Sequence, residues 1–139
     1  LTAQTVTRFG LGSAPNTWDS LVRAMKALGY SEQELFDGGL VRHGRSGGVY
    51  DTFRNRLMFP VIDVRGNVIG FSGRILGDGE PKYMNSPETI VFSKSHNLFA
   101  LNLAKKSKCG YIILAEGNID VASLHQAGFD SAVASLGSP

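Results

Sequence analysis

The chain has 139 residues, 42% of them hydrophobic and 19% charged, which fits one soluble domain or a domain with part of another. The single cysteine, Cys109, excludes a disulfide framework and a zinc site made mainly of thiolates, and it fits a reducing compartment. No apolar run approaches the roughly 20 residues that cross a bilayer, and the polar N-terminus lacks the pattern of a signal peptide. We therefore expect a cytoplasmic protein without a membrane partner.

The charged residues are distributed unevenly along the chain. Residues 1–41 carry three basic and four acidic side chains, whereas residues 42–108 carry eleven basic and five acidic ones, a balance of +6. Residues 109–139 carry three acidic side chains and no lysine or arginine. The middle block is therefore a candidate for binding a polyanion such as nucleic acid or a nucleotide. The alternative is a basic face that is only solvated.

The pattern of residues 1–40 is typical of short helices joined by tight loops. A helix is predicted from a capping pair at residues 16–17 to about Leu28, where a glycine ends it. A second short helix should follow, because Ser31 and Glu34 have the spacing of a capping box. Three apolar side chains are expected in the core of this part: Trp18, Leu21 and Leu28.

Residues 41–108 have the pattern of strands and turns. Two apolar, β-branched runs, Leu57–Val64 and Val68–Leu76, flank a turn at Arg65-Gly66-Asn67 and predict a hairpin. Pro60 should lie at a sheet edge or a bulge, because it cannot donate to a ladder. Weaker patterns predict two further segments, an ordered loop over Pro81–Lys94 and a helix over Phe99–Lys106.

Residues 109–139 predict a βαβ unit. Tyr111–Ala115 is almost wholly apolar, as buried parallel strands are. A helix from Asn118 or Asp120 to about Ala127 should follow, and then a second apolar strand over Ser131–Ser135. The fold class is therefore α/β. Two parallel strands do not complete a sheet, so we expect either that the unit docks onto the preceding block or that the chain is truncated.

Glu116 and Gly117 directly follow the first strand of this unit, at the edge where open α/β sheets bind their ligands. The carboxylate could bind Mg²⁺ or move a proton, and Gly117 permits close approach of the backbone. Alternatively, Glu116 only favours the dipole of the following helix. Asp120, one turn further on, is more often a helix-capping acid than a catalytic one.

In the basic block, Arg54 and Arg56 would face the same way on a strand, where together they could grip a phosphate. Lys82 and Lys94 lie in the predicted loop with Asn85 between them, and a loop rich in donors suits phosphate or ribose contacts. Each of these groups could instead be a solvated side chain without a ligand. The three histidines lack the spacing of metal ligands: His43, His96 and His125.

A series of stretches resembles, in the same order, the signatures of the bacterial DnaG-type DNA primases. They are Arg8-Phe9 with Gly12–Trp18, Tyr50–Pro60, Val68–Arg74, Pro81–Thr89 with Phe92 and Lys94, and Glu116–Val121 with Ala134–Gly137. The Glu116–Val121 run resembles the opening motif of the Toprim domain. Together these stretches cover nearly the whole chain, and they are specific only as a set.

The resemblance implies that residues 1–108 form the mixed α+β N-terminal subdomain of the primase RNA-polymerase core, and that residues 109–139 begin a truncated Toprim domain. It implies synthesis of short RNA primers on single-stranded DNA from nucleoside triphosphates, through an RNA–DNA hybrid. Glu116 would be the catalytic glutamate at a Mg²⁺ or Mn²⁺ site, Asp120 its partner acid, with further metal ligands beyond Pro139. The groove for template and nucleotides would be lined by Arg8, Arg54, Arg56, Arg74, Lys82, Asn85 and Lys94.

The family also implies zinc in a further N-terminal domain and a replicative helicase bound through a C-terminal region. Neither region is expected within these residues. Because the further acidic motifs of the Toprim domain are expected beyond Pro139, the chain alone should not polymerise RNA. Thr52 stands where the family usually has arginine, Asn118 where it has an aromatic residue and Ser72 where it has glycine, which indicates a divergent member of chromosomal or mobile-element origin. Two alternatives remain open, another Toprim nuclease or topoisomerase and a non-catalytic module that binds single-stranded nucleic acid.

Overall fold

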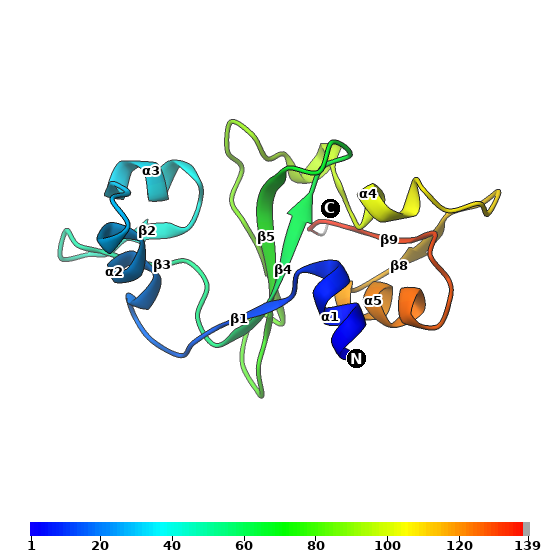
Figure 1. Cartoon of the computed structure of the whole chain (residues 1–139). Helices are drawn as coiled ribbons and strands as arrows, with labels where there is room; N and C mark the ends of the chain where they lie inside the picture. The colour runs from blue at the N-terminus through cyan, green and yellow to red at the C-terminus, as the bar shows by residue number, and fades with distance from the viewer. Residues whose placement is uncertain (138–139) are drawn as a thin grey trace.

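The computed structural model describes residues 1–137, which form three parts arranged side by side (Figure 1). A helical lobe lies at one end, a twisted antiparallel sheet in the middle, and a βαβ unit at the other end. The predicted mixture of helices and strands is confirmed. None of the helices in the described residues is long and apolar enough to span a membrane.

The helical lobe consists of α2 (Ser20–Ala27), α3 (Glu32–Asp37) and the hairpin of β2 (Val41–His43) and β3 (Val49–Asp51). The predicted capping box is present, since Ser31 accepts from the N–H of Glu34 while the Glu34 carboxylate accepts from the N–H of Ser31. The lobe has its own small core, made of Val22, Leu35 and Val41.

The first helix of the lobe begins later than predicted, at Ser20 rather than next to residues 16–17. The buried carboxylate of Asp51 explains the start, because it accepts the N–H groups of Leu21 (2.9 Å) and Val22 (3.0 Å). Two of the three predicted core residues are wrong, since Trp18 is 55% exposed and Leu28 is 73% exposed. Leu21 is half-buried.

The central sheet has the order β1-β4-β5-β6, with β1 over Gly12–Ala14, β4 over Arg56–Ile62, β5 over Val68–Ile75 and β6 over Tyr83–Asn85. The β4–β5 hairpin and its turn are confirmed. Pro60 lies beyond the residues of β4 that pair with β1, next to a register shift at Val61/Ile62, so its placement at an edge is also confirmed. The predicted loop over residues 81–94 contains β6, so that loop is partly wrong.

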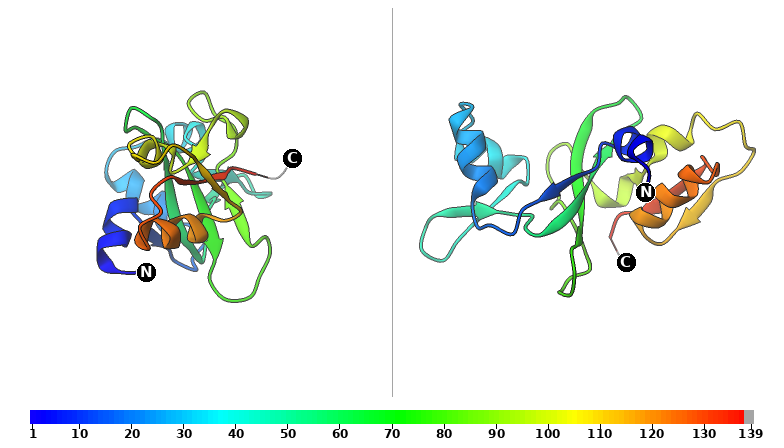
Figure 2. Two further views of the ribbon diagram at one scale, coloured as in Figure 1. Left: turned by 90° about the vertical axis from the view of Figure 1, so that its right-hand side faces the viewer. Right: turned by 60° about the horizontal axis from the view of Figure 1, so that its bottom comes forward.

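The third part contains β7 (Leu98–Phe99), α4 (Leu101–Ala104), β8 (Ile113–Ala115), α5 (Asn118–Gln126) and β9 (Ala132–Ser135). A short 3₁₀ helix, η1 (Lys94–His96), leads into it. β8 and β9 are parallel and joined by α5, which confirms the predicted βαβ unit. The N-terminal helix α1 (Ala3–Phe9) lies beside α5 (Figure 2), tied by a hydrogen bond from the Thr2 N–H to the side chain of Gln126.

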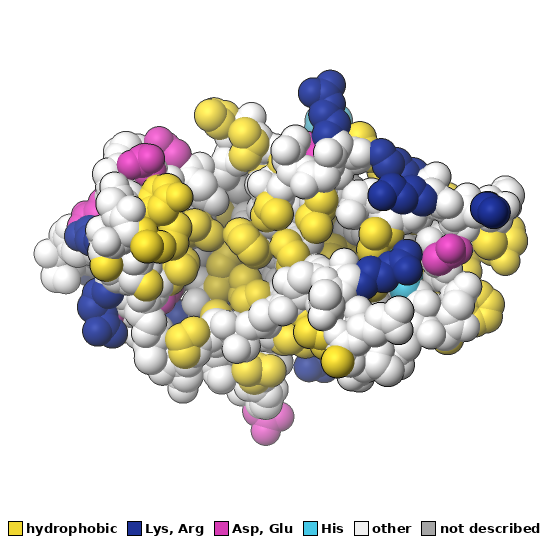
Figure 3. Space-filling view, in the orientation of Figure 1, with side chains coloured by type: hydrophobic (Ala, Val, Ile, Leu, Met, Phe, Trp, Pro, Cys, Tyr) yellow, Lys and Arg dark blue, Asp and Glu magenta, His cyan; other side chains and the backbone are white. Residues whose placement is uncertain are grey.

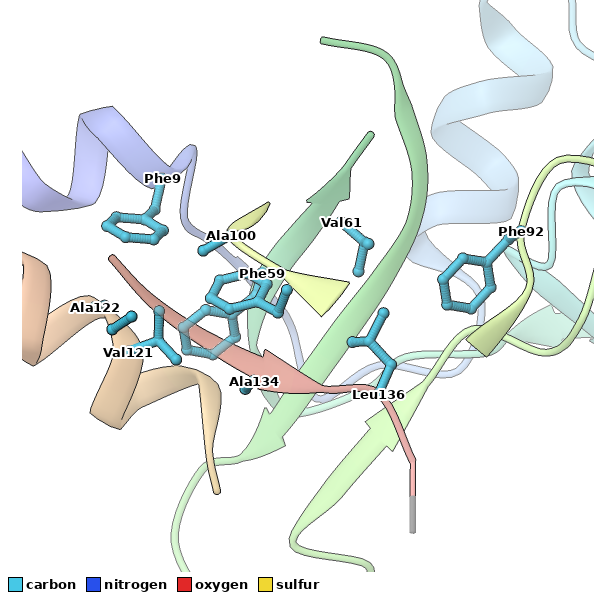
Figure 4. Packing of buried hydrophobic residues seen from close by; sticks show 11 residues of the cluster. Phe9, Phe59, Val61, Phe92, Ala100, Val121, Ala122, Ala134 and Leu136 are labelled. Carbon is cyan, nitrogen blue, oxygen red and sulfur yellow. The ribbon is translucent and has the colours of Figure 1, made fainter. Parts of the chain in front are cut away.

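The main core lies between one face of the central sheet and the βαβ unit (Figure 4). Three phenylalanine rings pack together there, from Phe59 of β4, Phe99 of β7 and Phe9 of α1. The ring centres of Phe59 and Phe99 are 5.7 Å apart, and those of Phe99 and Phe9 are 5.8 Å apart. The βαβ unit is therefore docked onto the preceding block, which is one of the two outcomes expected from the sequence. The predicted burial of the strand around Ile112 and Leu114 is wrong, because these side chains are 53% and 70% exposed.

Candidate nucleic-acid and nucleotide site

A cleft of about 420 Å³ opens where the central sheet meets the βαβ unit. Strands alternate their side chains between two faces, so Ser72 of β5 and its partner Asn85 of β6 lie on the same sheet face as Phe59. That face points to the βαβ unit. The cleft is lined by Ser72, Tyr83, Asn85, Glu116, Gly117, Asn118, Ser135 and Gly137.

The two predicted catalytic acids lie together at this cleft. Glu116 is exposed at the end of β8, and Gly117 is the residue before α5. A Cβ built on Gly117 would lie 3.2 Å from a carboxylate oxygen of Asp120 and 2.8 Å from the hydroxyl of Tyr83. Asp120 stands in the first turn of α5, where the helix dipole favours a negative charge. The predicted pair therefore shares its site with a tyrosine that the sequence analysis missed.

The donor set fits part of a divalent metal site. Mg²⁺ is usually held by one or two carboxylates together with water and substrate phosphates. Glu116 and Asp120 are two exposed carboxylates four residues apart, one directly after β8 and the other in the first turn of α5. The described residues contain no group of three or more His, Cys, Asp or Glu side chains that could hold a metal ion by themselves.

Three of the predicted binding residues border this cleft. Asn85 lines it directly, and Arg74 pairs with Tyr83 across β5 and β6, on the same sheet face. Lys94 comes close at Gly137, where an added Cβ would lie 3.5 Å from the Lys94 side chain and 3.8 Å from the Asn85 amide nitrogen. The main-chain N–H of Lys94 donates to the carboxylate of Glu88. Lys82 is exposed beside β6.

The prediction that Arg54 and Arg56 share a strand face is wrong. Asn55 between them has a left-handed backbone (φ 53°), and β4 begins only at Arg56. The Arg56 side chain is buried and donates to the carbonyl oxygens of Gly73 and Lys82. Burial, and then the neighbouring charge of Arg54, lowers the pKa of Arg56 from its ordinary value. An arginine nevertheless stays protonated at neutral pH, so both residues contribute positive charge.

Arg54 belongs to a partly exposed stack on the helical lobe, in which Trp18 is exposed and Tyr50 and Arg54 are half-buried. The rings of Trp18 and Tyr50 are stacked, with centres 4.2 Å apart and planes inclined by 18°. The Arg54 guanidinium lies 4.9 Å from the centre of the Trp18 ring and 5.3 Å from that of Tyr50. We call these three residues the aromatic–arginine stack. Sequence analysis missed Trp18 and Tyr50, because an aromatic residue in an amphipathic segment is indistinguishable from a core residue before the fold is known.

The positive charge of Arg54 forms no ion pair with an acidic side chain within the described residues. The two ion pairs that these residues form are Arg23–Asp19 and Lys26–Glu32, on the surface of the helical lobe. Within the same residues the buried Nε of Arg54 has no hydrogen-bond partner. That nitrogen is too buried to meet a ligand, so only the terminal nitrogens of the guanidinium could donate to a phosphate or a base edge.

Arg8 lies neither at the cleft nor in the aromatic–arginine stack. It is exposed on α1, where it borders a small polar pocket with Thr5, His125 and Gln126. His125 packs against Phe9 and contacts the Ala132 carbonyl through Nε2, so it is a packing residue. Thr52, where the sequence departs from the primase signature, is buried, whereas the other two departures, Ser72 and Asn118, line the cleft.

Comparison with known proteins gives the family. A family model described as the DNA primase catalytic core, N-terminal domain, matches residues 1–105. A DNA primase of Clostridium acetobutylicum is 52% identical over 135 residues, which is 96% of this chain and 22% of that protein. The chain therefore spans about a fifth of the length of this curated relative.

Solved structures agree. A DnaG primase catalytic domain bound to single-stranded DNA matches with a TM-score of 0.88 and 42% identity, covering 99% of this chain and 45% of that one. An Aquifex aeolicus primase with zinc-binding and RNA-polymerase domains matches with a TM-score of 0.84 and 35% identity, covering 99% and 34%. These matches favour a primase over the topoisomerases and nucleases considered from the sequence. The chain belongs to the DnaG DNA primase family and is part of its catalytic core.

Proposed function

We propose that this chain supplies the template-binding and nucleotide-facing part of a primase, which synthesises short RNA primers on single-stranded DNA. In this proposal residues 1–108 are the N-terminal subdomain of the core, and residues 109–139 begin a Toprim domain. The protein acts in the cytoplasm with nucleoside triphosphates and an RNA–DNA hybrid. Zinc and a replicative helicase are expected to bind regions other than this chain.

The observation that carries the proposal is the aromatic–arginine stack. A ring that is exposed and stacked offers a flat face to any base, and such stacking is tolerant of sequence. Arg54 stands over the same rings with its positive charge unpaired among the described residues. A single strand could therefore place a base on Trp18 and a phosphate on Arg54 at once.

The cleft is assigned to the incoming nucleotide and the growing end. Arg74, Lys94 and Asn85 offer cationic and amide donors for phosphate and ribose oxygens. Glu116 and Asp120 offer carboxylate oxygens to Mg²⁺ or Mn²⁺, which would stabilise the charge that develops on the transferred phosphoryl group. The Tyr83 hydroxyl lies close to the turn at Gly117, so we expect it to help position the two acids.

The test is binding of a fluorescent single-stranded oligonucleotide by anisotropy over a salt series. We compare the wild type with Arg54→Ala/Lys82→Ala and with Arg65→Ala/Lys108→Ala, which removes the same charge at two exposed positions elsewhere. The first variant should bind more weakly, with a log–log salt slope shallower by about 1.4, since each phosphate contact to a single strand is worth about 0.7. Equal weakening in both variants would leave only general electrostatics and overturn the proposed template site.

A second measurement addresses catalysis in the full-length protein. Glu116→Gln should abolish primer synthesis and leave the affinity for single-stranded DNA unchanged, because Glu116 lies in the cleft and not in the stack. If this variant retained wild-type synthesis, the assignment of the cleft would be wrong while the template site could stand.

A further inference from the structure

We propose that an apolar cavity behind the aromatic–arginine stack is a regulatory site for a small molecule with an aromatic or aliphatic body and one cationic head. The cavity has a volume of about 460 Å³ and lies between α2, β1 and the face of the central sheet opposite the catalytic cleft. Figure 3 looks into the hollow lined by hydrophobic side chains between the helical lobe and the sheet. This volume lies in the range of small-molecule pockets.

The walls of the cavity specify an apolar body. Met58 of β4 and Phe71 of β5 come from the sheet, and Leu21 and Met25 come from α2. Phe53 and Leu40 close the cavity from the segments next to the β2–β3 hairpin. Two of these side chains are methionines, whose flexible thioethers adapt to irregular ligands.

One residue of the cavity wall, Asp51, favours a cationic head group on the ligand. Asp51 lines the cavity and is only 2% exposed. Its two oxygens accept the N–H groups of Leu21 and Val22, and no cation among the described residues pairs with it. A buried carboxylate without a cation favours a positively charged ligand group over a neutral one, and opposes a negative one.

The cavity is built on the same two segments as the stack. Along the chain, Tyr50 and Arg54 of the stack flank Asp51 and Phe53 of the wall, and Trp18 stands between the wall residues Pro15 and Leu21. Main-chain hydrogen bonds join the two segments, from Asp51 to the Trp18 carbonyl (2.9 Å) and from Asn55 to the Pro15 carbonyl (3.1 Å). A ligand that braces these walls therefore holds the stack in its observed arrangement.

The coupling between ligand binding in the cavity and DNA binding at the stack, which rests on the proposed template site, should be positive. A ligand that fits the assembled cavity stabilises the assembled stack, so ligand and single-stranded DNA should strengthen each other's binding. The size of the effect is limited by how often the stack is disassembled in the free protein. A tightening of DNA binding by about two- to fivefold is expected, at the low end of coupling energies in proteins.

The first experiment measures ligand binding without DNA. Three probes of one shape, 1-naphthylmethylamine, 1-naphthylmethanol and 1-naphthoic acid, are titrated into the full-length protein and followed by calorimetry and by the fluorescence of the probe. The amine should bind with a dissociation constant of about 1 mM or below, and the alcohol about tenfold more weakly. The acid should bind most weakly. Equal affinities, or the opposite order, would overturn the role given to Asp51.

Two variants at one position locate the site. Met25→Trp fills the cavity and should abolish binding of the amine, whereas Met25→Leu conserves volume and should retain it. Circular dichroism and the melting temperature check that both variants fold. If Met25→Trp binds the amine as well as Met25→Leu does, the amine binds elsewhere and the proposed site is wrong.

The last step adds fluorescent single-stranded DNA at fixed ionic strength. Saturating amine should tighten DNA binding by wild type and Met25→Leu, but not by Met25→Trp. If the wild type binds DNA and the amine with no mutual effect, the coupling is refuted and the ligand site stands. If the wild type fails to bind DNA at all, the proposed template site fails, and the binding of the amine is judged separately.

Discussion

The hydroxyl of Tyr83 lies close to Gly117, only 2.8 Å from the place that a Cβ on this residue would occupy. The edge strand of the central sheet thus lies close to the turn between Glu116 and α5. Real Cβ atoms essentially never approach so closely, so any side chain at this position requires Tyr83 or the turn to shift, whereas the backbone angles of Gly117 are open to other residues. A residue more than thirty positions earlier therefore restricts the turn between the two acids.

Gly117→Ala should impair the cleft without unfolding the protein. The added methyl group forces Tyr83 or the turn to move, at a cost of about 1–3 kcal/mol, as overpacking does. Primer synthesis by the full-length enzyme should fall at least tenfold, because misplacement of catalytic groups by about 1 Å can cost a factor of 100. Gly12→Ala is the matched control, since a Cβ at Gly12 meets nothing within 4 Å. Equal losses in both variants would contradict the role of the Tyr83 contact.

The elements with local signals were predictable from the sequence. The capping box at Ser31, the turn at Arg65-Gly66-Asn67 and the βαβ unit depend on residues a few positions apart, and all three are confirmed. The α4 helix also forms, but over only Leu101–Ala104 of the predicted range. No side chain caps its N-terminus at Ala100.

The wrong predictions concern which side chains are buried and which face of a strand they lie on. Residues distant in the sequence determine both properties. Trp18 looks like a core residue in sequence, but its ring stacks on Tyr50 at the surface. Arg54 and Arg56 appear to share a face only if the strand includes both, and the left-handed Asn55 separates them. Glu116 and Asp120 were found because the parallel strand ends at a recognisable Glu-Gly pair, whereas Tyr83 reaches them only through the fold.

Trp18→Ala should weaken binding of single-stranded DNA with little effect on stability, because the ring is more exposed than buried. Loss of one stacked base is worth about 1–3 kcal/mol, which corresponds to roughly a 5- to 150-fold change in dissociation constant. Trp18→Phe keeps a flat face and should recover most of the affinity. Anisotropy titrations measure both, and an unchanged affinity in Trp18→Ala would show that the stack carries no base.

Arg56→Met should act mainly on stability. The guanidinium fills a buried place and donates to the carbonyls of Gly73 (3.1 Å) and Lys82 (3.4 Å), the second of which also accepts the Ile75 N–H. Losing these buried hydrogen bonds costs about 1–3 kcal/mol, measurable as a lower midpoint in urea. Arg65→Met, at an exposed turn position, is the control and should change stability by less than about 0.5 kcal/mol. If the two variants unfold alike, the buried hydrogen bonds of Arg56 contribute nothing.

The β4–β5 turn should respond to acid through Asp63. The N–H of Asn67, and with it that of Arg65, donates to one Asp63 oxygen at 2.9 Å, which lowers the pKa of this carboxyl below its ordinary value. Because the folded pKa is depressed, the turn is fully stabilised above the ordinary pKa of about 3.9, and the contribution is lost as the pH falls through the lower folded value. The amide signals of Arg65 and Asn67, followed by NMR from pH 6 to 2, should titrate with a midpoint below that ordinary value. Asp63→Asn keeps an acceptor oxygen but cannot titrate, so its amide signals should stay constant over the same range. A midpoint at or above the ordinary value in the wild type, or the same titration in Asp63→Asn, would mean that these hydrogen bonds do not hold the carboxylate.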